Sequence, residues 1–420
     1  MDSAHSGGQF KLRHYPRPPP YEARFSWSRR ARAGRCGVGV AMQVAAWPET
    51  IQDRPIRGGA VVVHAPPDLG FADPHEEATR REIARRLAGL RGAEFAGPYE
   101  PALPYLPPVY FVTGATLVGI AAAQALGIRC EHDLFGGVVP HAFVATKAIT
   151  HPLVRPDAEA PDGWSEDFPE RVRHAALAGF SAFSHADAAE AGARLLAQGP
   201  VRVKPVQATA GRGQTVVADA AALADALAPM DAAELAVYGL VLEENLTNVT
   251  TYSVGQVRVA DLVATYWGTQ RLTFDGGGEA VYGGSDLVVA RGGFDALLAL
   301  GPSEEARLAV AQARAYDEAA GACFPGLFAS RRNYDVAQGL DAEGRRRSGV
   351  LEQSWRMGGA SSAEIGALEA FRADPDLAAV RASSMEVHGG GEPPPHAAVY
   401  FRGVDERLGP LVKYAVVEPL

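Results

Sequence analysis

Two carboxylates lie at the ends of apolar runs late in the chain. Asp335 closes a run of strand-forming residues, and Glu352 closes another after Val350 and Leu351. A polar turn that contains Gly344 separates the runs, so we predict a hairpin with the two carboxylates side by side. Carboxylates in this position repel each other unless a cation lies between them. Magnesium prefers such oxygen ligands and keeps substrate phosphates in its shell, so the pair predicts a phosphate-bearing substrate.

A phosphate site is predicted earlier in the chain, where a β-branched run ends at Lys204. The loop that follows contains Gly211, Arg212 and Gly213. Glycine lets backbone N–H groups turn toward an anion, and a lysine adds a point charge. The loop does not match the P-loop pattern, which needs Gly-Lys-Ser/Thr at the start of a helix. A Gly-x-Gly between strands is also typical of an ordinary hairpin turn, and this alternative stays open.

An apolar run at 238–242 leads into Glu243 and Glu244, followed shortly by Leu246. Such a strand can offer backbone groups to an adenine edge and a carboxylate to the adenine amino group or a ribose. The alternative is a strand end with solvated charges.

The order and spacing of these residues resemble the ATP-grasp superfamily over roughly residues 105–370. The resemblance implies that Lys147, Lys204 and the loop at Gly211, Arg212 and Gly213 hold the phosphates of ATP. It implies that the strand with Glu243, Glu244 and Leu246 contacts the adenosine. It also implies that Asp335, Glu352 and Ser354 hold magnesium. The chain looks most like a bacterial branch that is distantly similar to D-alanine–D-alanine ligases and biotin carboxylases.

Two positions depart from the superfamily pattern. Ser354 stands where the superfamily has an asparagine, and a hydroxyl is a shorter arm than an amide. The acid that binds the ribose would fall near Thr250 or Thr251. The site then either holds ATP less tightly or uses Glu244 for the ribose.

The fold expected is α/β and α+β, with strand–helix alternation at the start of the chain. We predict strands at 59–64 and 109–112 and helices at 76–90 and 116–126. The resemblance implies an ATP-grasp fold: an N-terminal Rossmann-like pre-ATP-grasp domain and two α+β ATP-binding subdomains. The expected segments are a pre-ATP-grasp domain at 55–145, subdomain A at 146–238, subdomain B at 239–371, and a linker with a C-terminal β-hairpin at 372–420.

Composition limits the class of protein. The chain has 420 residues, enough for two or three cores, and 47% of them are hydrophobic. A net charge of −9 argues against a general nucleic-acid binder. Three scattered cysteines are too few for a disulfide framework and favour a reducing, cytoplasmic location. No apolar run is long enough to span a membrane.

Residues 1–41 differ from the rest of the chain. They carry eight Lys or Arg against two acids and show no apolar periodicity. We predict a disordered tail, or an over-extended start with Met42 as the first residue.

These observations lead to one expected function. An ATP- and Mg²⁺-dependent ligase would activate a small-molecule carboxylate as an acyl phosphate for attack by an amine. Arg356 would stabilise the transferred phosphoryl group, and Arg271 would face phosphate or a substrate carboxylate. The alternatives are activation of bicarbonate, as in biotin carboxylases, and a non-catalytic ATP-binding or regulatory protein. The expected partners are the two small substrates, with no nucleic acid and no membrane, and a homodimer is left open.

Overall fold

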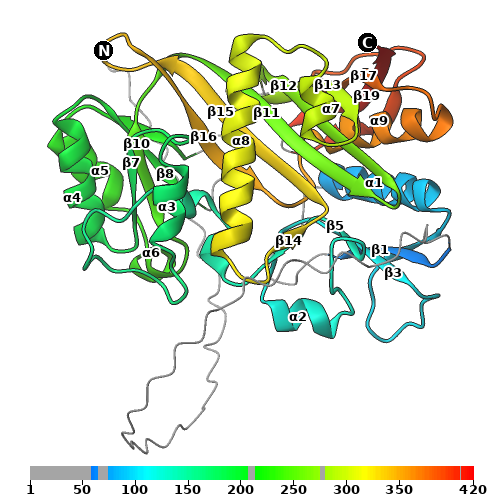
Figure 1. Ribbon diagram of the computed structural model, residues 1–420, viewed down its shortest axis with the longest axis horizontal. Helices are drawn as coiled ribbons and strands as arrows, with labels where there is room; N and C mark the ends of the chain where they lie inside the picture. The colour runs from blue at the N-terminus through cyan, green and yellow to red at the C-terminus, as the bar shows by residue number, and fades with distance from the viewer. Residues whose placement is uncertain (1–57, 65–73, 207–212, 275–279, 407) are drawn as a thin grey trace, which may run out of the picture. The chain divides into compact units, whose positions relative to one another are not determined.

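Several sheets and the helices that cover them form the protein, shown as a computed structural model in Figure 1. The structure describes residues 58–64, 74–206, 213–274, 280–406 and 408–420. The predicted disordered tail at 1–41 and the loop residues Gly211 and Arg212 lie outside the described residues. The expected mixture of α/β and α+β elements is present.

A parallel sheet comes first in the chain, in the order β2-β1-β3-β5. Its strands are β1 (Ala60–His64), β2 (Glu94–Pro98), β3 (Val109–Thr113) and β5 (Leu134–Phe135). The valines of β1 are buried, as expected for a strand covered on both faces. Helix α1 (Pro74–Arg91) packs its Ile83 and Leu87 into the same core. The strands predicted at 59–64 and 109–112 and the helix predicted at 76–90 are confirmed.

The helix predicted at 116–126 is shorter than expected. Strand β4 (Leu117–Val118) comes first, and α2 (Ile120–Ala125) begins only after Gly119, whose φ of +92° favours glycine. A small sheet in the order β14-β6-β4 joins β4 to β6 (Gly137–Val139) and β14 (Phe328–Ala329). Two 3₁₀ turns follow β6, η1 (Ala142–Ala145) and η2 (Lys147–Thr150).

An antiparallel sheet in the order β7-β10-β8-β9 lies in the next part of the chain. Its strands are β7 (Gly179–Ala182), β8 (Val201–Pro205), β9 (Thr215–Val217) and β10 (Leu240–Glu244). The helices in this part of the chain are α3 (Asp167–Val172), α4 (His185–Leu196), α5 (Ala220–Leu227) and α6 (Ala232–Tyr238), and the last three share a core with the sheet. Because β10 pairs with both β7 and β8, it groups with the segment before the predicted boundary at 239.

The largest sheet is antiparallel, and its edge strand β16 starts the order β16-β15-β11-β12-β13-β17-β19-β18. In that order, the strands are β16 (Arg346–Ser354), β15 (Arg331–Leu340), β11 (Thr247–Val259), β12 (Leu262–Phe274), β13 (Ala280–Arg291), β17 (Ala379–His388), β19 (Gly409–Pro419) and β18 (Ala398–Asp405). The hairpin predicted around Asp335 and Glu352 is confirmed as β15 and β16.

Helices cover both faces of this large sheet. The chain contributes α7 (Phe294–Leu298), α8 (Glu304–Cys323) and α9 (Ser361–Ala373) here. Tyr316 of α8 contacts Tyr334, whereas Glu364 of α9 bonds Arg331. Residues 331 and 334 point to opposite faces because side chains alternate along a strand. Therefore α8 covers one face and α9 the other (Figure 1). Within the described ranges, no helix is both long and apolar enough to cross a membrane.

Candidate active site

Asp335 and Glu352 lie directly opposite each other on β15 and β16. Burial, and then the negative charge of Glu352, raise the pKa of Asp335 to about 6. The side chain of Glu352 is 37% exposed, so its carboxylate is accessible to a ligand. Two carboxylates that disfavour each other's ionisation in this way would both be stabilised by a shared cation.

Three polar side chains that no sequence motif marks surround Asp335. Asn333 donates from Nδ2 to Asp335 Oδ1 at 2.9 Å, and Ser253 donates from Oγ to the same oxygen at 3.3 Å. Gln270 donates to Ser253 Oγ at 3.1 Å and also bonds Asp335. Asn333 was detectable as the residue two before Asp335 on the same face, but Ser253 and Gln270 come from β11 and β12. We call the face of the large sheet that carries these side chains and Glu352 the site face.

Lys147 reaches Glu352 from η2, with 2.6 Å between Nζ and Oε2. The adjacent residue Gln353 donates to the backbone carbonyls of Val144 and Thr146 at 3.1 and 2.7 Å. These bonds attach the segment before Lys147 to the edge strand. Although desolvation of its partly exposed side chain raises the pKa of Glu352, the positive charge of Lys147 outweighs this effect and the net pKa lies below the ordinary value.

Lys204 belongs to a buried group of three charged or polar side chains. It forms an ion pair with Glu243, which also lies 3.2 Å from His151 Nε2. Burial lowers the pKa of Lys204, and the carboxylate of Glu243 opposes that shift. His151 had no motif to reveal it in the sequence. In this arrangement, the carboxylate of Glu243 holds the Lys204 ammonium rather than facing solvent.

The two lysines and the two acids form one electrostatic cluster. Lys204 interacts with the charges of Lys147 and Glu352 as well as with Glu243. Arg356 is close enough to Glu352 and Asp335 for both charges to act on it, although burial lowers its pKa. The structure therefore brings together residues from η2, β8, β15, β16 and the segment that follows β16.

The family described as "Protein of unknown function (DUF3182)" matches residues 63–415. The chain belongs to this family. No curated protein matches it. Among solved structures, phosphoribosylamine–glycine ligase from Thermotoga maritima aligns over 85% of this chain and 91% of its own, with 14% identity and a TM-score of 0.43. D-alanyl-alanine synthetase A from Vibrio cholerae aligns over 71% of this chain and 89% of its own, with 10% identity and a TM-score of 0.40.

TM-scores below 0.5 do not establish a shared fold, so the function of this DUF3182 member is argued from its own residues.

The carboxylates of Asp335 and Glu352 fit a magnesium ion. No group of three or more His, Cys, Asp or Glu suited to a metal occurs among the described residues. Asp335 and Glu352 offer two carboxylates instead, and magnesium commonly takes one or two carboxylates and completes its shell with water and phosphate.

The structure places Arg271 on the opposite face of the large sheet from Asp335 and Glu352, so its contact with phosphate or a substrate carboxylate stays a prediction. Gln270 points to the site face, so the next residue along β12 points to the opposite face. There Arg271 is 53% exposed and forms a two-bond ion pair with Asp286. The adjoining glycine cluster predicted at 276–278 lies outside the described residues.

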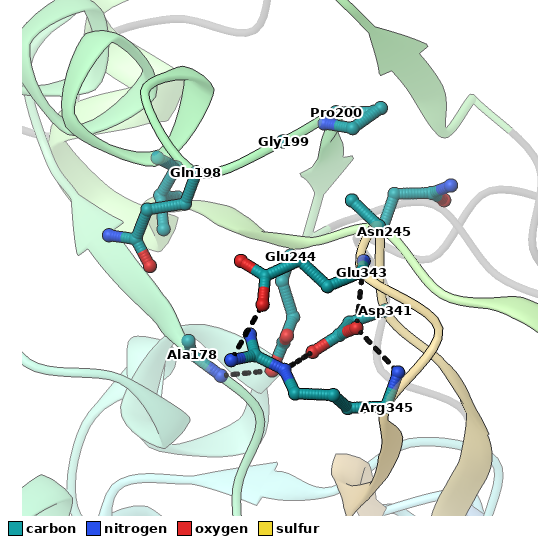
Figure 2. Close-up of a pocket in the computed structure, with 11 residues that line it drawn as sticks. Ala178, Gln198, Gly199, Pro200, Glu244, Asn245, Asp341, Glu343 and Arg345 are labelled. Atoms are coloured by element: carbon teal, nitrogen blue, oxygen red, sulfur yellow. Dashed lines mark hydrogen bonds and ion pairs between the residues drawn. The ribbon is translucent and has the colours of Figure 1, made fainter.

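Glu244 and Leu246 are also directed away from the cluster. Glu244 accepts from the backbone N–H of Ala178 at 2.9 Å and from Arg347 at 2.8 Å. It lines the pocket in Figure 2, where Arg345 pairs with both Asp341 and Glu343. Leu246 is buried in an apolar cluster with Leu177 and Ala337. Adenosine contacts by Glu244 and Leu246 stay predictions.

Two further predicted site residues have identifiable surroundings. Gly213, at the described end of the glycine loop, has φ +69°, and its loop joins the antiparallel strands β8 and β9. Ser354 accepts from Arg331 Nη1 at 3.2 Å, so a cation already occupies one side of its hydroxyl. A positive guanidinium beside the hydroxyl disfavours a second cation there.

The low pKa of Glu243 leads us to expect that the folded protein loses stability in acid. Burial raises its pKa, but Lys204 and His151 outweigh this and hold it at about 2, below the ordinary 4.5. The unfolded chain therefore binds the proton first, and the ionised carboxylate stabilises the fold above about pH 4.5. This contribution is lost as the pH falls toward 2. We expect the urea midpoint to fall between pH 6 and pH 3, and to fall less in Glu243→Gln. Equal losses in both proteins would assign the effect to other carboxylates.

Proposed function

We propose that this protein is an ATP- and magnesium-dependent ligase that joins a small-molecule carboxylate to an amine. The observation that carries the proposal is the cluster in which Lys147 bonds Glu352, Glu352 lies opposite Asp335, and Lys204 lies within electrostatic reach of both Lys147 and Glu352. Two cations beside two carboxylates can bind the phosphates and the metal ion of a metal–nucleotide complex.

The ion pair between Lys147 and Glu352 suggests how the contacts of Lys147 would change when a metal binds. Without a metal, the lysine neutralises Glu352. A divalent cation on Glu352 and Asp335 would take over that neutralisation and free the Lys147 ammonium for a phosphate oxygen. Lys204 would remain directed by Glu243 while it binds a second phosphate oxygen. Bound magnesium would supply neutralisation of the β- and γ-phosphate charge.

The proposed chemistry has two steps. A carboxylate oxygen of the first substrate attacks the γ-phosphorus of ATP, ADP leaves, and an acyl phosphate forms. The amine nitrogen of the second substrate then attacks the acyl carbon, inorganic phosphate leaves, and the amine gives up a proton as the amide forms. Arg356 would stabilise the negative charge on the transferred phosphoryl group, as an oriented cation does in other phosphoryl transfers. Lys147, Lys204 and Arg356 would act by orienting and neutralising, without a covalent intermediate on the protein.

The test measures ATP binding and ADP release separately. Calorimetry with ATP at millimolar concentration and Mg²⁺ is expected to show binding that requires the metal. ADP release is then followed with pooled small carboxylates, pooled amines, both pools, or bicarbonate. Release that requires both pools supports the ligase. Release with bicarbonate alone, or binding with no release under any condition, would replace it with one of the two alternative functions. No ATP binding would end the whole assignment.

A further inference from the structure

A buried chain of polar groups leads from α9 to the proposed metal site. Tyr266 Oη lies 2.5 Å from Glu364 Oε1 and 2.8 Å from Asn333 Oδ1. Asn333 Nδ2 lies 2.9 Å from Asp335 Oδ1. Tyr266 and Glu364 are fully buried and Asn333 nearly so. A Cβ at Gly255 would lie 2.3 Å from Tyr266 Oη, so the glycine leaves the space that this phenol occupies.

In this arrangement, the buried series of polar groups has one hydrogen fewer than its hydrogen bonds need. The amide of Asn333 uses an N–H to donate to Asp335, which turns its oxygen toward Tyr266. A phenol has a single hydrogen, so Tyr266 can donate to Asn333 or to Glu364 but not to both. One of the two short oxygen–oxygen contacts, 2.5 or 2.8 Å, then has no hydrogen between its atoms. A buried contact of this kind is unfavourable.

Rotating the amide of Asn333 by half a turn moves the contact that lacks a hydrogen from Tyr266 to Asp335. The two ends of an amide have nearly the same shape, so rotation needs no other movement. The nitrogen of Asn333 then donates to Tyr266, and Tyr266 donates to Glu364, so both inner contacts are satisfied. The oxygen of Asn333 now faces the carboxylate of Asp335. Two oxygens in this position are stable when a cation lies against both of them.

We propose that Asn333 is a ligand of the divalent cation held by Asp335 and Glu352, and that its amide rotates when the cation binds. This inference rests on the proposed function. Asn333 lies directly across the ladder from Ser354 and two residues before Asp335, so its side chain is on the site face. Side chains at such a cross-strand pair are neighbours on one face. The Asn333 amide is therefore free to reach the cation, while the Ser354 hydroxyl is bonded to Arg331.

The rotation would also couple the metal to the segment that carries Arg356. Glu364 holds Arg331 by several bonds, and Arg331 Nη1 donates to the backbone carbonyls of Ser354 and Arg356 at 3.3 and 2.8 Å. With the amide rotated, the Tyr266 hydroxyl donates its hydrogen to Glu364. The cation then stabilises one arrangement of the whole chain from Asp335 to α9.

The sequence offers a direct spectroscopic test because it contains only three asparagines, Asn245, Asn248 and Asn333. Full-length protein labelled with ¹⁵N-asparagine gives three side-chain amide signals, and the signal lost in Asn333→Asp identifies Asn333. At pH 8, adding Mg²⁺ is expected to shift this signal most and to create an NOE between its amide hydrogens and the ring hydrogens of Tyr266. The other two asparagines serve as internal references.

Metal affinity of three variants gives a second readout, measured by calorimetry after their thermal midpoints are compared. Asn333→Leu removes the ligand oxygen and is expected to weaken Mg²⁺ binding roughly 10- to 100-fold. Asn333→Asp keeps an oxygen at the site and is expected to bind at least as tightly as the wild type. Gln338→Leu is the matched control, because Gln338 is an amide on the same strand that donates to the backbone of Glu305. Its affinity is expected to stay unchanged.

The outcomes separate this inference from the proposed function. If Mg²⁺ binds through Asp335 and Glu352 but produces no NOE to Tyr266, the rotation is wrong and the ligase proposal stands. Weaker binding in Asn333→Asp than in Asn333→Leu would mean that Asn333 serves only as a hydrogen-bond donor to Asp335. If the wild type binds no Mg²⁺ even with ATP, the metal site itself fails.

Discussion

Replacing Glu352 by glutamine is expected to abolish Mg²⁺-dependent ATP turnover while leaving the protein folded. Glutamine keeps the shape of the side chain but removes the charge that Lys147 neutralises and that raises the pKa of Asp335. Changes in groups that merely support a metal ligand cost roughly 10–100-fold. Loss of a ligand's own charge is expected to cost at least about a hundredfold in turnover. Titration of Mg²⁺ against ATP binding and ADP release measures the effect.

Two companion variants show whether the loss belongs to the metal site. Asp335→Asn is expected to behave nearly as Glu352→Gln does. Glu343→Gln changes an exposed acid in the turn between the same two strands and is expected to leave Mg²⁺ dependence unchanged. Unchanged metal dependence in Glu352→Gln would show that the hairpin does not hold the metal.

Replacing Lys204 by methionine is expected to affect both stability and ATP binding. Lys204 and Glu243 are buried and paired, so the change leaves a buried carboxylate without its cation. Breaking a buried pair in this way costs about 3–5 kcal/mol in the free energy of unfolding. Loss of a charge-assisted phosphate contact is worth a further 1.5–3 kcal/mol in binding, or roughly 10- to 150-fold in Kd. Urea unfolding and calorimetry measure the two effects.

The double variant Lys204→Met/Glu243→Met separates stability from binding. Replacing both members of a buried pair with apolar residues is often nearly neutral, so most of the lost stability is expected to return while ATP binding stays weak. Lys413→Met is the control for the loss of a lysine, since Lys413 pairs with Glu386 across β19 and β17 rather than with Glu243 or Glu352, and it is expected to leave ATP binding unchanged. If the double variant binds ATP as the wild type does, Lys204 is only a structural residue.

Strand periodicity and turn residues in the sequence were sufficient to place Asp335 beside Glu352. Both acids end apolar runs that a polar turn connects, and a hairpin allows few registers for such a pair. The same local reasoning placed Lys204 at the end of β8 and predicted β1, α1 and β3. These features depend on residues close in the chain, which is why the sequence alone determines them.

The side of the sheet on which Arg271 lies could not be predicted in the same way. Alternation along β12 shows that Arg271 and Gln270 face opposite ways, but it does not say which face of the sheet carries Asp335. That choice depends on β11, which lies between β12 and β15 and carries Ser253 on the site face. Only the strand order of the assembled sheet decides it.

The rest of the site depends on contacts between distant segments. Lys147 meets Glu352 because η2 is attached to the edge strand by Gln353, and His151 meets Glu243 only once η2 packs against β10. Local sequence patterns do not specify such contacts, because burial in a shared core brings these segments together. The sequence by itself therefore determined the hairpin that carries Asp335 and Glu352 and the strand that ends near Lys204. Tertiary packing decided which cations, amides and buried acids surround them.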